Sequence, residues 1–63
     1  MIKVLKKAID EEIDGAANYF GITSEMDKMG VPYYITKHIY KMAEDELKHA
    51  EKLEKILGIL NSK

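Results

Sequence analysis

The sequence predicts an all-α protein: an antiparallel two-helix hairpin that dimerises into a four-helix bundle. The chain has only 63 residues and no cysteine, so a monomer would bury too little surface to be stable without a metal or a partner chain. Apolar residues recur every three or four positions along two long segments, which is the period of amphipathic helices. A single turn signal, Gly30 followed by the only proline, Pro32, separates the two segments.

The first predicted helix comprises residues 2–28. Its inner positions follow one another in steps of three and four, the spacing of the buried seam of a helix in a left-handed bundle. These positions are Ile2, Leu5, Ile9, Glu12, Ala16, Tyr19, Thr23 and Met26, with Ile13 and Phe20 beside them. Gly15 and Gly21 also fall inside this helix, where each costs about 1 kcal/mol relative to alanine. They either mark close helix contacts or have no packing role.

Residues 29–32 form the predicted turn, because glycine is favoured just after a helix and proline near the start of the next. The second predicted helix comprises residues 33–60, so residues 1–63 form one domain. Its inner positions are Ile35, Ile39, Met42, Glu46, His49, Leu53, Ile56 and Leu60, widened into a face by Ala43, Ala50 and Leu57. The link is short, so the helices are antiparallel neighbours, and two such hairpins close most simply as a four-helix bundle.

Charge and hydropathy exclude several classes of function. The 10 basic and 11 acidic residues give a net charge of −1, which provides no electrostatic surface for nucleic acid and no attraction to an anionic membrane. No apolar run approaches the roughly 18 to 20 residues that span a bilayer, and the first residues do not resemble a signal peptide. We therefore expect a cytoplasmic protein with neither a nucleic-acid nor a membrane partner.

Three polar residues occupy core positions of the predicted bundle: Glu12, Glu46 and His49. Burying an ionised carboxylate costs several kcal/mol unless another charge compensates it. Counted from Gly30 at about 1.5 Å per residue, all three residues lie at about the same height, and the Glu-x-x-His spacing puts Glu46 and His49 on one face. A two-fold dimer would gather four glutamates and two histidines, whose four negative charges match two divalent ions.

Other interpretations of these polar residues stay open. A core histidine can be satisfied by a backbone carbonyl, and a buried carboxylate by a lysine or a solvated groove. No lysine or arginine occupies a core position at that height, which favours the metal site. We expect His38 at the surface or at the boundary of the core, with a role in metal uptake as the alternative.

Tyr33, Tyr40 and Leu47 recur every seven residues away from the inner seam. They form either an ordinary boundary stripe or a second contact surface. A second contact surface would join dimers into a ring or a larger closed homo-oligomer.

Two segments resemble the ferritin-like di-iron carboxylate family that includes bacterioferritin and rubrerythrin. Residues 11–20, in which Glu12 is followed seven positions later by Tyr19, are similar to the family's first-helix pattern. Residues 45–51, with Glu46 and His49, are similar to its second-helix metal motif. The chain has half the usual number of helices, and in this it resembles the encapsulated ferritin-like proteins. Their hairpins form the di-iron centre across a subunit interface, and this resemblance implies an encapsulating shell as a partner.

The resemblance also implies roles for these residues. Glu12 would be a terminal carboxylate ligand, Glu46 a bridging one, His49 the imidazole ligand of the same iron and Tyr19 a hydrogen-bond donor near the cluster. Iron is the implied cofactor, with manganese or zinc as substitutes. The implied activity is that of a ferroxidase, which oxidises Fe(II) to Fe(III) with O2 or peroxide in iron handling or protection against oxidative stress.

A rival interpretation comes from a different class of function. The protein would then be a non-enzymatic dimerisation module, in which a metal is only structural or the buried Glu and His side chains form a polar network that fixes helix register.

Overall fold

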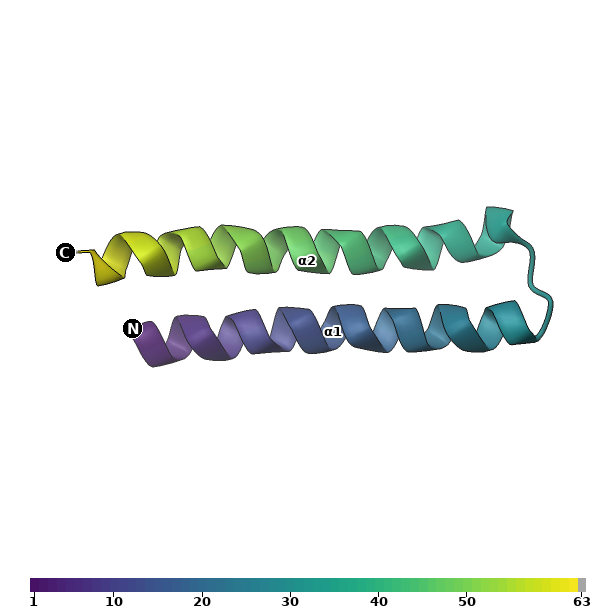
Figure 1. Ribbon diagram of the computed structural model, residues 1–63, viewed down its shortest axis with the longest axis horizontal. Helices are drawn as coiled ribbons and strands as arrows, with labels where there is room; N and C mark the ends of the chain where they lie inside the picture. The colour runs from purple at the N-terminus through teal and green to yellow at the C-terminus, as the bar shows by residue number, and fades with distance from the viewer. Residues whose placement is uncertain (63) are drawn as a thin grey trace.

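The structure, a computed structural model, describes residues 1–62, which form two helices and no strand. Helix α1 comprises Ile2–Lys28 and helix α2 comprises Tyr33–Asn61. The helices lie side by side and antiparallel, with the turn at one end and both termini at the other (Figure 1). The Cα atoms extend over 50 × 16 × 10 Å, so the molecule is a single layer, two helices wide. The predicted all-α hairpin is confirmed.

The turn depends on a helix end that requires glycine. Gly30 has a φ of +78°, in the left-handed region that glycine adopts without steric penalty. The N–H of Val31 donates to the carbonyl of Met26 at 3.0 Å, and the N–H of Gly30 donates to that of Asp27 at 3.1 Å. These two bonds define the Schellman motif. Pro32 then takes an extended conformation, with φ −69° and ψ 152°, and α2 begins at the next residue.

Helix α1 packs against α2 through most of the positions predicted for it, but Ile2, Ile13 and Phe20 of the predicted inner face are 40%, 43% and 42% exposed in the hairpin. The buried residues of α1 are Ile9, Ala16 and Thr23. Half-buried positions beside them are Leu5, Glu12, Tyr19 and Met26. Both sets recur every seven residues, so one stripe along α1 faces its neighbour.

The packed positions of α2 differ from the prediction. The residues buried in α2 are Thr36, Ala43 and Ala50. Residues predicted on the inner seam but exposed in the hairpin are Ile35, Met42, His49, Ile56 and Leu60. These five were predicted for the seam of a bundle of two hairpins, which a single chain does not test; within the hairpin, α1 packs instead against a neighbouring stripe on the wide apolar face of α2. Its smallest side chains take the positions of closest approach to α1, and four of the five, Leu60 excepted, lie about 100° further round the helix.

The two buried threonines satisfy their hydroxyls within their own helices. The hydroxyl of Thr23 donates to the carbonyl of Phe20 at 2.9 Å, and that of Thr36 to the carbonyl of Tyr33 at 3.5 Å. Threonine can therefore take a small, buried position in these helices without leaving an unpaired polar group.

A hairpin of one layer has two broad faces, and an aromatic cluster lies on one of them. Phe20 of α1 and Tyr33 of α2 each have ring centroids 6.3 Å from that of Tyr40, and the Tyr40 hydroxyl donates to Asp27 at 3.1 Å. We call this the aromatic face, defined by Phe20, Tyr33 and Tyr40. Tyr40 is half-buried within the hairpin, whereas Tyr33 is 69% exposed.

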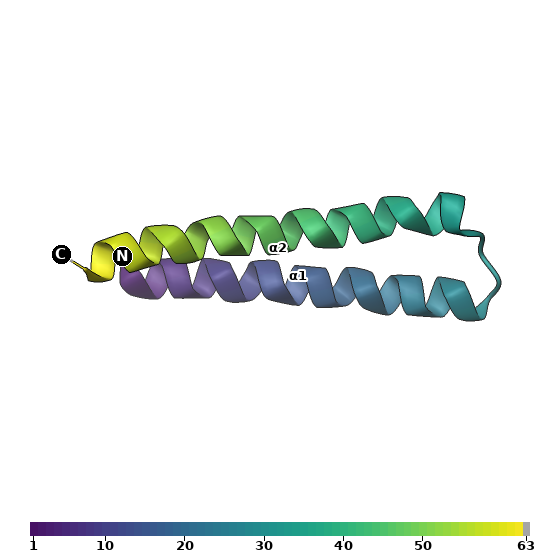
Figure 2. The ribbon, with the colours of Figure 1, turned by 45° about the horizontal axis from the view of Figure 1, so that its top comes forward.

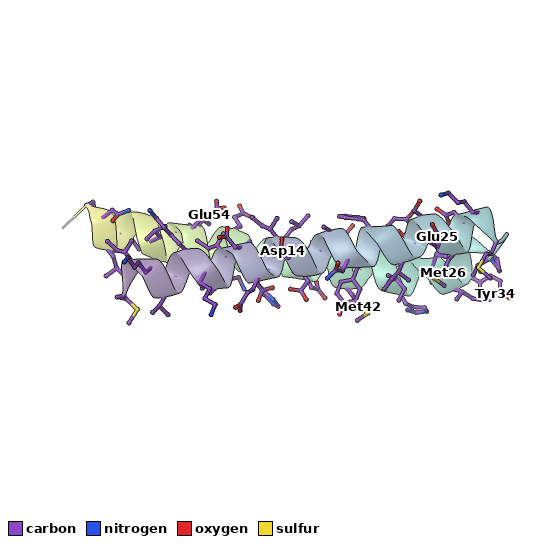
Figure 3. The ribbon with its side chains drawn as sticks, turned by 90° about the horizontal axis from the view of Figure 1, so that it is seen from below. Asp14, Glu25, Met26, Tyr34, Met42 and Glu54 are labelled. Carbon is purple, nitrogen blue, oxygen red and sulfur yellow. The ribbon has the colours of Figure 1, made fainter. Side chains whose placement is uncertain are left out.

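The opposite face carries the predicted metal ligands, and we call it the site face, defined by Tyr19, Met42, Glu46 and His49. Its separation from the aromatic face follows from helical geometry, because Tyr19 and Phe20 flank the buried stripe of α1 on either side. The 45° turn in Figure 2 confirms that the helices stay adjacent along their length. Figure 3 views the hairpin side-on, with α1 in front of α2, and there Met42 projects from one broad face and Glu54 from the other. Neither helix in the described range has the length and apolar character needed to cross a membrane.

Candidate metal centre

The three predicted ligands meet in the middle of the site face. Glu12 comes from α1, and Glu46 and His49 come from adjacent turns of α2. Each residue offers a ligand atom, and these atoms all lie within 4.8 Å of one another. Within residues 1–62, no other group of three histidine or acidic side chains converges in this way. Glu12, Glu46 and His49, which were predicted at one height by counting residues from the turn, therefore lie together in the structure.

One carboxylate oxygen of this group is buried without a hydrogen-bond partner. Oε2 of Glu12 has almost no contact with solvent, and no donor in the described part of the chain bonds to it. Its nearest nitrogen is Nδ1 of His49 at 3.4 Å, an ion-pair distance without hydrogen-bond geometry. A buried acceptor that lacks a donor is costly to the fold, and a bound cation would satisfy it. The residues present therefore fit a metal ion.

The pKa of Glu46 also reflects the close approach of two carboxyl groups. The pKa of Glu46 is raised, first by its hydrogen-bonding contact with the Glu12 carboxyl group, then by burial and by the negative charge of Glu12. His49 acts in the opposite direction and lowers it. Two neighbouring carboxyl groups thus resist being ionised together, and a divalent cation between them would remove that resistance.

A pocket opens onto the cluster from the solvent side. Its lining residues are Tyr19, Met42, Asp45, Glu46 and His49. Tyr19, predicted near the cluster, is therefore part of the wall. His38 is exposed and does not line the pocket, in agreement with its expected place at the surface.

Two residues of the pocket wall were not predicted from the sequence as part of the site. Met42 had been assigned to the packed seam, but it is 42% exposed at the pocket. Asp45 bonds to the Nζ of Lys41 at 2.9 Å, and this hydrogen bond is the main reason why the pKa of Asp45 is lowered. The available signal was helical spacing, because Asp45 stands four residues before His49 and so shares its side of α2.

Comparison with known proteins gives one match. The family model for rubrerythrin matches residues 3–63, a range that includes Glu12, Glu46 and His49. No curated protein and no solved structure matches the chain.

Proposed function

The chain belongs to the rubrerythrin family of ferritin-like di-iron proteins, and from this premise we propose that it is a ferroxidase whose di-iron site forms across a homodimer. Glu12, Glu46 and His49 are the ligands. The observation that carries the proposal is the buried, unpartnered Oε2 of Glu12 within a group of three converging ligand atoms. In the rival interpretation, a hydrogen-bonded polar network, a donor such as a protonated Glu46 would have to serve that oxygen.

A second copy of the chain completes the site. One hairpin offers two carboxylates and one imidazole, which is too few for two divalent ions. Two hairpins offer four carboxylates and two imidazoles, the ligand set of di-iron four-helix bundles, and their charge balances two M²⁺ ions.

Exposed apolar side chains support this mode of association. Ile35, Met42 and Ile56 flank the ligands along α2 and are 42%, 42% and 46% exposed. Ile22 lies on the same side of α1 and is 46% exposed. A single layer leaves these side chains in water, whereas two site faces packed against each other bury them and form a four-helix bundle. Two-fold symmetry makes the same surface serve both partners.

Iron, when bound, supplies the redox chemistry: two Fe²⁺ ions give up one electron each, and these reduce O2 with two protons to H2O2, or H2O2 with two protons to two waters. Glu12 and Glu46 hold the cations through hard oxygen ligands, which favour the more highly charged ion. When iron is bound, Glu12 would be the terminal carboxylate ligand and Glu46 the bridging one, as the family resemblance implies, and His49 would contribute a ring nitrogen. Tyr19 lines the pocket beside the cluster, and its hydroxyl would serve there as a hydrogen-bond donor.

Metal analysis and native mass measurement test this proposal on protein purified without added metal. We expect one iron per chain, a mass of two chains or a multiple of two, and Fe³⁺ absorption when Fe²⁺ is added in air. His49→Ala should lose iron binding and oxidation, whereas the matched variant His38→Ala should keep both. A stable dimer that neither binds nor oxidises iron would refute the ferroxidase and favour the dimerisation module.

A further inference from the structure

One glycine of α1 lies directly against the Glu46 carboxylate. A Cβ atom added at Gly15 would lie 3.1 Å from Cδ of Glu46 and 3.2 Å from both Oε1 and Oε2. These distances are shorter than the roughly 3.5–4.0 Å of ordinary non-bonded contact. A Cβ atom at residue 15 would therefore crowd the carboxylate, which would have to shift by a few tenths of an ångström.

The same helix contains a glycine without such a neighbour. A Cβ atom added at Gly21 would meet nothing within 4 Å. Glycine is the poorest helix former after proline, so both positions weaken α1, but only at Gly15 does the missing side chain make room for another group. Gly15 stands three residues after Glu12, on the adjacent turn of α1. The space left by its missing side chain therefore also lies beside the Glu12 carboxylate.

We infer that Gly15 is a positioning residue for the metal centre. Its missing side chain lets the Glu46 carboxylate approach the α1 backbone and lie beside Glu12, at the level where the three ligand atoms converge. A methyl group at residue 15 moves that carboxylate outward by a few tenths of an ångström or turns it to another rotamer. Metal ligands must be held to within about 0.5 Å of their working geometry, so an outward shift uses up most of that tolerance, a change of rotamer exceeds it, and either weakens binding. The role in metal binding rests on the proposed function, whereas the placement of Glu46 does not.

Gly15→Ala and its matched control Gly21→Ala test the role in binding. The metal-free proteins are titrated with Co²⁺ in the absence of oxygen, by calorimetry and by visible absorption. We expect Gly15→Ala to bind Co²⁺ about 10–100-fold more weakly, the effect typical of changes behind the ligands, with an altered Co²⁺ spectrum. Gly21→Ala should match the wild type in both. Wild-type affinity and spectrum in Gly15→Ala would overturn the inference.

Thermal unfolding of the metal-free proteins tests the placement independently of any metal. Gly21→Ala should raise Tm by about 4–8 °C, because alanine is the better helix former. Gly15→Ala should raise Tm clearly less, or lower it. In a Glu46→Ala background, which removes all three contacting atoms, Gly15→Ala should give the full increase.

These measurements separate failure of the inference from failure of the proposed function. An equal Tm gain from Gly15→Ala with and without the Glu46 side chain would overturn the placement. If Gly15→Ala alone does not fold, the inference requires the double variant with Glu46→Ala to fold, and an unfolded double variant contradicts it. A wild type that binds no Co²⁺ would refute the metal site, and the unfolding series would still decide whether Gly15 positions Glu46.

Discussion

Removing the Glu46 carboxylate should abolish most of the stabilisation that bound iron gives to the fold. Glu46 is one of the three candidate ligand residues that converge in the described part of the chain, and as a bridging carboxylate it would hold both cations. Glu44 provides the matched control, because it is an exposed glutamate of the same helix outside the cluster. The comparison is therefore between Glu46→Ala and Glu44→Ala, each with and without Fe²⁺ under anaerobic conditions.

The expected magnitude follows from one ion per chain. A ligand at 100 times its Kd stabilises the folded state by about 2.7 kcal/mol. For a chain of this size, 1 kcal/mol shifts Tm by about 4–8 °C, so Fe²⁺ should raise the Tm of the wild type by about 10–20 °C. If Glu46→Ala weakens binding 100-fold, the same Fe²⁺ concentration contributes only about 0.4 kcal/mol, or about 2–3 °C.

Thermal unfolding followed by circular dichroism, at one protein concentration for all variants, measures these shifts. Glu44→Ala should keep the wild-type response to Fe²⁺. The assignment fails if Glu46→Ala responds to Fe²⁺ as strongly as the wild type, or if Glu44→Ala loses as much of the response.

Three further predictions concern pH, oxidation rate and assembly. The pKa of Glu46 is raised above its usual 4.5, chiefly by the contact with Glu12, so the folded chain holds this proton more tightly than the unfolded chain. The Tm of the metal-free protein should therefore fall as pH rises from about 4.5 through the raised pKa, and Glu46→Gln should flatten that fall in calorimetric scans. Tyr19→Phe should slow Fe²⁺ oxidation in stopped-flow measurements while leaving Fe²⁺ affinity nearly unchanged; equal loss of both would contradict its role. If the aromatic face joins dimers, Tyr33→Glu should reduce a larger assembly to a dimer in light scattering and retain iron, whereas a wild-type mass of two chains would exclude that role. Tyr33 is a better target than Tyr40, which also packs within the hairpin.

The hairpin and the convergence of the site residues could both be predicted from the sequence. Gly30 and Pro32 are strong local signals, because few residues tolerate the backbone that each requires. Counting turns outward from them was enough to bring Glu12, Glu46 and His49 to one level. Their roles as ligands, and the dimer that would complete the site, remain predictions.

The orientation of α2 could not be predicted, because two adjacent stripes of this helix are both compatible with a core. Periodicity alone does not distinguish Ile35 and Met42 from Thr36 and Ala43. Side-chain size decides between them, since two helix backbones approach most closely over threonine and alanine. Because the packed stripe passes through Ala43, Met42 lines the pocket on the site face of the hairpin. Asp45 was not singled out, because it stands off the predicted inner seam of α2.

The roles of the two glycines of α1 also could not be predicted from the sequence. The sequence alone left two options for Gly15 and Gly21, a close contact or no packing role. In the structure, Gly15 makes a close contact and Gly21 has no packing role. The contact at Gly15 depends on a side chain from the other helix. No local pattern in α1 contains that information.

The turn at Gly30 also determines the order in which the hairpin can form. Every contact between α1 and α2 closes a segment of chain that contains this turn, and the entropy lost on closure grows with the length of the segment. Helix pairing should therefore nucleate beside Met26 and Thr36 and zip toward the two termini. Glu12, Glu46 and His49 come together midway through this process. The helical turns near Met1 and Asn61 pair last and fray first. Amide hydrogen exchange should accordingly be slowest near the turn and fastest at the open end. Metal binding should slow exchange most in the part of each helix between the cluster and the open end.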